Sequence, residues 1–228
     1  MQEAAGAHGL TPSVLTFEPH PRRVFAPQAP HFRIEPLAQK LRRLRALGVA
    51  QVFMPRFTRD FAALSAEQFL DEVLGRQLNA RAVVTGEDFA FGKGRAGDVA
   101  LLRNWGAAQR VAVHTVPALM AEGEVCSSST VRHALGEGDV DHACALLGHP
   151  YRLEGRVMHG DKRGRTLGVP TANIALPPGL RLPRYGIYAC WAFVDGVRSM
   201  GAALPNGGPA TGQAATPTSR RQCGSTPV

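Results

Sequence analysis

The sequence has no long apolar run, few cysteines and no recognisable leader. No stretch of the chain approaches the roughly 20 apolar residues that span a bilayer. The first residues, MQEAAGAHGL, lack the basic and apolar regions of a secretory signal. The four cysteines have neither C-x-x-C spacing nor a histidine partner at metal-site spacing. These absences predict a cytoplasmic protein with free thiols and no membrane partner.

Two kinds of catalytic arrangement are also missing. No Ser-His-Asp set and no metal-binding pair of histidines can be read from the spacing of these residues. His114, expected in a strand, and His142, expected in a helix, are therefore given no role. Acidic residues are absent after Gly201 and aromatic residues after Leu204. A segment of that composition cannot bury a core, so residues 203–228 are expected to be disordered.

What the chain does contain is an ordinary apolar fraction and an excess of positive charge. Apolar residues make up 44% of the 228 residues, the net charge is +8 and the pI is about 10.0. The charge favours anionic partners. Because the basic residues are scattered, apart from residues 42–45 and 162–165, a soluble enzyme with phosphate-bearing ligands is favoured over a nucleic-acid binder.

Strand and helix signals alternate over residues 10–150. Ser65 and Gln68 form a capping box, Asp98 and Asp139 are expected to cap later helices, and Ser128 or Ser129 to cap another. Strands are expected at residues 14–17, 49–54, 81–85 and 111–116. This order predicts an α/β fold in which helices cover both faces of a parallel sheet, with ligands bound beyond the carboxyl ends of the strands.

The pattern changes near Pro150. Residues 151–158 and 187–194 read as strands separated by glycine and proline turns, with no helix between them. A second, β-rich domain is therefore expected to begin at this point.

The most informative segment is residues 157–174, VMHGDKRGRTLGVPTANI. Its glycines allow backbone N–H groups to form an anion-binding nest, beside the charges of Arg163 and Arg165. Thr171 and Asn173 supply hard oxygen ligands of the kind that Mg²⁺ accepts next to phosphates. The segment favours a nucleotide-phosphate and Mg²⁺ site. A glycine-rich hairpin with solvated arginines is the alternative.

Two further motifs follow expected strands. TFEPHP holds His20 and Pro21 in a stiff, extended loop, where the histidine would contact a phosphate or a ring face, or be incidental. In GEDFAFGKGR, Phe89 and Phe91 would stack on an aromatic ring and Asp88 would bind a heterocycle edge. The alternative is that the two phenylalanines fill the core.

A hydroxyl-rich motif, CSSSTVR, begins a helix. Ser127, Ser128 and Ser129 offer donors to an anion at the helix N-terminus, and Arg132 would pair with a phosphate. The alternative, an N-cap, explains one serine but not all three.

Taken in order, these blocks resemble the bacterial bifunctional FAD synthetases, in which a riboflavin kinase is joined to an FMN adenylyltransferase. The resemblance runs from about residue 10 to about residue 201. It rests on the blocks TFEPHP, ALSAEQF, GEDFAFG, SSSTVRHAL, LLGHPY, GRTLGVPTANI and YGIYA.

The resemblance implies a fold with two parts. The first, residues 1–148, would be a nucleotidyltransferase-like (Rossmann-like) parallel sheet that lacks its first strand. The second, residues 149–202, would be an incomplete flavokinase-type β-barrel, followed by the tail at 203–228.

The same resemblance implies the chemistry and the sites. ATP and Mg²⁺ would serve to phosphorylate riboflavin to FMN and to adenylylate FMN to FAD, without nucleic acid. The ATP phosphates of the adenylyl site would contact Ser127, Ser128, Ser129 and Arg132. The flavin or adenylyl pocket would be formed by His20, Pro21, Asp88, Phe89 and Phe91. Thr171 and Asn173 would hold Mg²⁺ and ATP in the kinase site, under a loop containing Gly160, Gly164 and Gly168.

Two parts of the family pattern are not found, namely the Gly-x-Phe-Asp-Gly-x-His-x-Gly-His block and the carboxylate base of the kinase. The catalytic residues therefore stay unknown, and this chain itself is expected to be incomplete for both reactions. The change of composition near Ala203 suggests a truncated or frameshifted gene, which translation of the other reading frames would test. A non-catalytic flavin- or nucleotide-binding remnant is the alternative function, and a basic nucleic-acid-binding protein is the third.

Overall fold

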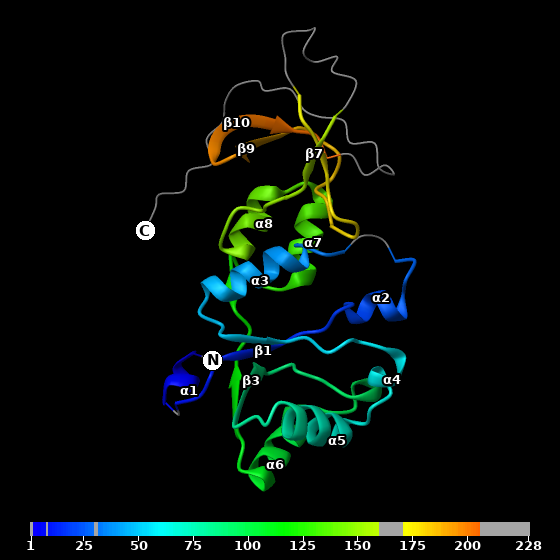
Figure 1. Cartoon of the computed structure of the whole chain (residues 1–228), viewed down its shortest axis with the longest axis vertical. Helices are drawn as coiled ribbons and strands as arrows, with labels where there is room; N and C mark the ends of the chain where they lie inside the picture. Colours follow the sequence, from blue (N-terminus) through cyan, green and yellow to red (C-terminus); the bar gives the residue numbers. More distant parts are fainter. Residues whose placement is uncertain (1, 8, 30–31, 160–170, 206–228) are drawn as a thin grey trace. The chain divides into compact units, whose positions relative to one another are not determined.

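The computed structural model describes residues 2–7, 9–29, 32–159 and 171–205, which belong to two compact units (Figure 1). The first unit comprises Met1–Pro30 and Leu37–Met120, and the second comprises His31–Pro36 and Ala121–Val228. Each unit has a buried core of its own.

The first unit alternates between strands and helices, as expected for an α/β fold. Strand β1 pairs in parallel with β2, with α2 and α3 between them in the chain, and β3 pairs in parallel with β4, with η2 and α6 between them. Within the described residues these are separate two-stranded ladders. In chain order the elements are α1 (Gln2–Ala7), β1 (Ser13–Leu15), α2 (Pro21–Phe25), α3 (Leu37–Ala46), β2 (Gln51–Phe53), α4 (Arg59–Ala62), α5 (Ala66–Gln68), η1 (Phe69–Gln77), β3 (Ala82–Gly86), η2 (Lys93–Arg95), α6 (Val99–Gln109) and β4 (Ala112–Val116).

Side-chain caps begin the main helices of this unit. The Ser65 hydroxyl accepts from the Gln68 N–H at 3.1 Å and the Gln68 side chain accepts from the Ser65 N–H at 2.8 Å, which confirms the capping box. Asp98 accepts from the Leu101 N–H at 2.8 Å, as expected, and the helix that it caps, α6, runs to Gln109. After the capping box the helix widens to π-type hydrogen bonding over Phe69–Gln77.

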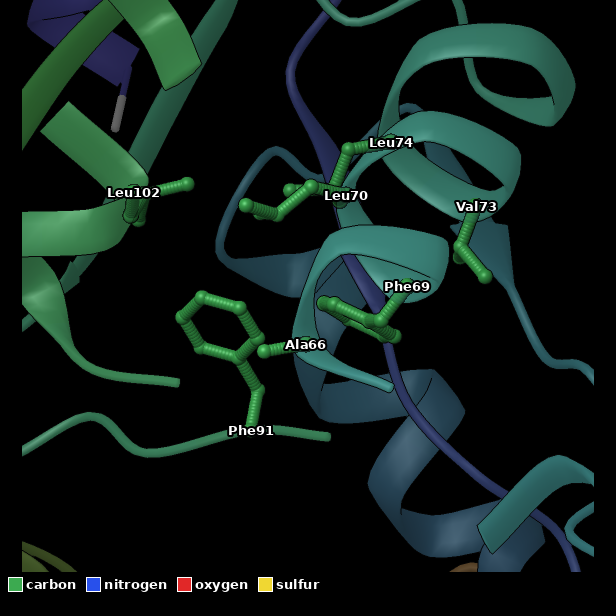
Figure 2. Packing of buried hydrophobic residues seen from close by; sticks show 7 residues of the cluster. All are labelled: Ala66, Phe69, Leu70, Val73, Leu74, Phe91 and Leu102. Carbon is green, nitrogen blue, oxygen red and sulfur yellow. The ribbon is translucent and has the colours of Figure 1, made fainter. Parts of the chain in front are cut away.

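The core of the first unit lies between η1 and α6. Leu70 and Val73 face inward with 1% of each residue exposed, and Leu102 of α6 is fully buried. Figure 2 shows Leu102 pointing toward Leu70, with the Phe91 ring beside Ala66. Each such side chain contributes about 1.5–3 kcal/mol on burial.

Seven phenylalanines join this core into a continuous chain of ring contacts. Their centroids lie between 5.2 Å and 6.4 Å apart, the range in which aromatic rings attract one another. In the order of contact they are Phe25, Phe57, Phe17, Phe61, Phe69, Phe91 and Phe89.

The loop between β3 and α6 is fixed onto the start of α5. Phe91 and Gly97 exchange two backbone hydrogen bonds, of 3.0 Å and 2.9 Å. A Cβ on Gly97 would lie 2.5 Å from the Phe91 ring and 2.8 Å from the Ala66 Cβ, so only glycine fits at this position. Gly92 has a φ of +74° and would place a Cβ 2.7 Å from the Ala66 backbone.

The second unit has a helical part followed by antiparallel strand pairs. Its core comprises Val131, Ala134, Leu135, Ala143 and Leu146. Strand β7 pairs with β8, and β9 with β10; no closed barrel is present among the described residues. The elements are β5 (Met120–Ala121), β6 (Glu124–Val125), α7 (Ser128–Glu137), α8 (Val140–Leu147), β7 (Arg156–Met158), β8 (Asn173–Ala175), β9 (Tyr188–Val194) and β10 (Val197–Ala203).

Three expectations for this unit need correction, while the Asp139 cap of α8 is confirmed. Helix α7 is capped by Ser127, not by Ser128 or Ser129, because the Ser127 hydroxyl accepts from the Thr130 N–H. The strand expected at residues 151–158 is confined to Arg156–Met158, because Tyr151 is turned into the core below α7 and α8. Disorder was expected over residues 203–228, but Ala203 is the last residue of β10, where it pairs with Tyr188; residues 206–228 lie outside the described residues.

Replacing Phe91 by alanine should destabilise the first unit by about 3–5 kcal/mol, because the deletion leaves a cavity in the core between Phe69 and Phe89. Denaturant unfolding measures this change. Phe25→Ala is the control: Phe25 lies at the end of the chain with 65% of the residue exposed, and its loss should cost less than about 1 kcal/mol. Equal losses for the two variants would contradict the assignment of Phe91 to the core.

Candidate functional site

The loops that follow β1 and β3 converge on the same aromatic core. Phe17, in the loop after β1, contacts Phe61, which contacts Phe69. Phe69 in turn contacts Phe91, in the loop after β3. The packing therefore holds two of the predicted site loops on one side of η1, although the loops are about 70 residues apart in sequence.

His20 and Pro21 begin α2. The Nδ1 atom of His20 accepts from the Arg22 N–H at 3.1 Å and caps this short helix, while Pro21 occupies its first position. The His20 residue is exposed. The cap gives the histidine after the first proline a structural role. The predicted contact of His20 with a phosphate or a ring stays a proposal.

The loop after β3 separates the roles of its three candidates. Phe91 has 6% of its surface exposed and lies in the core. For this residue the structure therefore contains the alternative given above, in which the phenylalanine fills the core. Phe89 is half-buried and stacks on Phe91 at 5.2 Å. Asp88 is exposed, and its Oδ1 would lie 2.9 Å from a Cβ at Gly86. Of the three candidates, Phe89 and Asp88 are thus the ones that a ligand can reach.

The three serines before α7 divide into one structural residue and two available ones. Ser127 accepts from the Thr130 N–H at 3.1 Å and lies 2.6 Å from the Thr130 hydroxyl, which itself donates to the Val125 carbonyl. Ser128 and Ser129 are exposed in the first turn. Helix geometry leaves their N–H groups without an intrahelical carbonyl, so this turn presents hydroxyl and amide donors together.

Arg132 lies one turn further along α7. Its Nε donates to the Phe32 carbonyl at 2.7 Å, and its guanidinium lies 5.8 Å from the centroid of the Phe32 ring. These contacts hold segment His31–Pro36 against the helix. The predicted phosphate contact of Arg132 would have to be made by the other nitrogens of its guanidinium group.

The residues proposed to hold Mg²⁺ lie at the end of the β7–β8 pair where the chain connects the two strands. Asn173 is the first residue of β8 and is paired with Met158, the last of β7. Thr171 is exposed two residues earlier. Both offer uncharged oxygen atoms suited to a hard cation. Gly160, Gly164 and Gly168, in the connection between the two strands, lie outside the described residues.

An electrostatic contact that the sequence did not reveal lies next to α7. His142 of α8 places Nδ1 3.1 Å from Glu122 and Nε2 3.4 Å from Glu124, on the β5–β6 hairpin. The hydrogen bond with Glu122, followed by that with Glu124, raises the pKa of His142. The only signal of this contact in the sequence is the pair of glutamates at positions i and i+2. No local sequence pattern connects that pair with a histidine 18 residues away. Within the described residues, no group of three or more His, Cys, Asp or Glu could hold a metal ion.

Comparison with known proteins identifies the family. Residues 1–130 match the family model of FAD synthetase, and residues 147–218 match that of riboflavin kinase. The chain belongs to the FAD synthetase family. This confirms the resemblance drawn from the sequence blocks.

Three relatives of this FAD synthetase family member are named bifunctional riboflavin kinase/FMN adenylyltransferase. The protein of Escherichia coli strain K12 is 39% identical over 189 residues, covering 83% of this chain and 60% of that protein. That of Listeria monocytogenes is 38% identical (89% and 64%), and that of Bacillus subtilis 39% identical (86% and 61%). The chain therefore spans less than two thirds of the length of these relatives.

A solved structure shares the fold. A crystal structure described as that of a macrolide-efflux protein from Streptococcus pneumoniae matches with a TM-score of 0.82 and 30% identity, covering 94% of this chain and 70% of that one. In the part of the chain that the structure describes, no helix has the length and apolar character needed to cross a membrane.

Measurements of the free energy of unfolding can test which of the three serines of this family member caps α7. Ser127→Ala removes the cap of α7 and should lower the free energy of unfolding by about 1 kcal/mol. Ser128→Ala and Ser129→Ala, the matched controls, should change it by less than about 0.5 kcal/mol because both side chains are exposed. Denaturant titration decides; a larger loss at Ser129 than at Ser127 would contradict the assigned cap.

The His142 contact should make stability depend on pH. Because the folded-state pKa is raised, the contact stabilises the fold fully below the ordinary histidine pKa, and the effect is lost as the pH rises through the raised value. NMR titration of His142 should show its pKa falling in the Glu122→Gln variant, since Glu122 is the largest cause. An unchanged pKa in that variant would refute the contact.

Proposed function

We propose that this chain carries the two activities for which its relatives are named, the phosphorylation of riboflavin to FMN and the adenylylation of FMN to FAD. ATP is the second substrate of both reactions. The observation that carries the proposal is the first turn of α7, where Ser127 satisfies the cap and leaves Ser128 and Ser129 exposed. A helix start with spare hydroxyl and amide donors suits the phosphates of ATP.

In the adenylyl reaction, a phosphate oxygen of FMN attacks the α-phosphorus of ATP and pyrophosphate leaves. The protein contributes mainly by positioning and charge stabilisation. Ser127, Ser128, Ser129 and Arg132 would line the phosphates. His20, Pro21, Asp88 and Phe89 would line the flavin or adenylyl pocket, with Phe91 supporting Phe89 from the core.

In the kinase reaction, the riboflavin hydroxyl attacks the γ-phosphorus of ATP, ADP leaves and the hydroxyl proton is released. Thr171 and Asn173 would hold Mg²⁺ through a hydroxyl and an amide oxygen, and the donor set fits this cation. Bound Mg²⁺ neutralises negative charge on the phosphates. Gly160, Gly164 and Gly168 would belong to the loop over them.

The domains that we propose are residues 1–148 for adenylyl transfer, on a nucleotidyltransferase-like parallel sheet, and 149–202 for the kinase, on an incomplete β-barrel. Riboflavin, FMN and ATP are the proposed partners, with no nucleic acid and no membrane. The proposed location is the cytoplasm, which the uncrosslinked thiols of Cys126, Cys144 and Cys190 suit.

Paired variants test both activities in one assay. The chain is incubated with ATP and Mg²⁺ and either riboflavin or FMN, and the flavins are separated by chromatography. The double variant Ser128→Ala/Ser129→Ala should lower FAD formation at least about tenfold and leave FMN formation intact, since hydrogen bonds to a charged phosphate are lost. Thr171→Ala/Asn173→Ala should do the opposite.

Each variant serves as the control of the other. Equal losses of FMN and FAD in both variants would contradict the assignment of separate sites. Flavin and ATP binding without any FMN or FAD would favour the alternative, a non-catalytic binding protein.

A further inference from the structure

Helix α7 is held at its middle and at its last turn by segments that lie far away in the sequence. All of these segments belong to the second unit. One is His31–Pro36, and the others come from the part of the chain that matches riboflavin kinase, residues 147–218. The contacts connect the helix that begins with the phosphate-binding turn, defined as Ser127, Ser128 and Ser129, to residues of the kinase match.

The first half of α7 is attached through Arg132. Its Nε donates to the Phe32 carbonyl, and the Phe32 and Arg33 N–H groups both donate to the Gly179 carbonyl, at 3.1 Å and 2.9 Å. The Arg181 N–H donates back to the Arg33 carbonyl at 2.7 Å. A short parallel bridge therefore ties Arg132 to residues 179–181.

Tyr151 closes this chain of contacts onto the core below the helix. Its hydroxyl donates to the Arg181 carbonyl at 2.6 Å, and its ring packs against the cluster that contains Val131 and Leu135 of α7. Burial of the ring raises the pKa of the Tyr151 hydroxyl, so the hydroxyl stays protonated and a donor.

The last turn of α7 is attached through Tyr188. The Arg184 N–H donates to the Leu135 carbonyl at 2.8 Å, and the Tyr188 hydroxyl donates to the Arg184 carbonyl at 2.6 Å. Gly138, with a φ of +85°, ends the helix at a point where a Cβ would lie 2.9 Å from the Tyr188 hydroxyl. The close approach of Tyr188 thus requires glycine at this position.

We propose that Tyr151 and Tyr188 are positioning residues for the phosphate-binding turn of α7. An α-helix is rigid over the 10 residues of α7, so fixing its last turn and its side fixes the direction of the exposed donors of Ser128 and Ser129. The inference rests on the proposed adenylyl-transfer function. It adds that residues of the kinase match determine how the adenylyl site binds ATP.

The chain provides a matched set of variants, because its tyrosines are Tyr151, Tyr185 and Tyr188 only. Tyr151→Phe and Tyr188→Phe each remove one hydroxyl from the proposed positioning contacts. Tyr185→Phe is the control: Tyr185 belongs to the same segment, but 71% of the residue is exposed. The three variants make the same chemical change.

Mg²⁺-ATP is titrated into the ¹⁵N-labelled full chain, and the amide shifts of Ser128 and Ser129 report the Kd at that turn. We expect the Kd to rise about fivefold in Tyr151→Phe and in Tyr188→Phe, as one net hydrogen bond is lost. In Tyr185→Phe the change should stay below about twofold. Hydrogen exchange of the Thr130 and Val131 amides, which donate to the hydroxyl and the carbonyl of Ser127, should accelerate in the first two variants only.

Thermal unfolding of each variant separates positioning from general stability. An unchanged Kd at Ser128 and Ser129 and unchanged exchange at Thr130 and Val131, with only a lower Tm, would overturn the proposal. If ATP produces no shift at this turn in the parent chain, the proposed function fails. The exchange rates then decide the positioning role by themselves: faster exchange supports it, and unchanged exchange overturns it.

Discussion

The first unit depends on the packing of Phe91 against Ala66 and Gly97. Two glycines and one alanine leave room for a single aromatic ring, and a methyl group on Gly97 would overlap that ring. The ring completes the series of contacts that runs from the loop after β1 to the loop after β3. Each dispersion contact between close-packed atoms is weak, but their sum over these rings is large. The packing therefore holds in place the loop backbones that carry Phe89, Asp88 and His20.

The second unit depends on hydrogen bonds to backbone carbonyls. Three side chains donate to backbone carbonyls: Tyr151 to that of Arg181, Tyr188 to that of Arg184, and Arg132 to that of Phe32. Such bonds are modest in net energy but specific in direction. Apolar packing under α7 supplies the stability, and these donors determine its orientation.

Local signals in the sequence predicted the parts of the fold that local interactions determine. The Ser65 capping box and the Asp98 and Asp139 caps involve partners three residues away, and the structure contains all of them. The Ser127 cap was missed because three successive serines offer the same local chemistry. The contacts of Arg132 with Phe32 span 100 residues, and no local pattern encodes them.

The two family matches and the two compact units divide the chain differently. The FAD synthetase match ends at residue 130 and the riboflavin kinase match begins at 147, so neither match contains the segment between them. In the structure that segment is most of α7 and α8, whose core includes Val131, Leu135 and Leu146 together with Tyr151 of the kinase match. The helix that begins with the phosphate-binding turn therefore packs against Tyr151 from beyond the FAD synthetase match as well as against Ile34, Ala121 and Cys126 within it. Dividing the chain after residue 130 or before residue 147 would expose this core. The segment between the matches is therefore part of a folded unit and not a flexible linker.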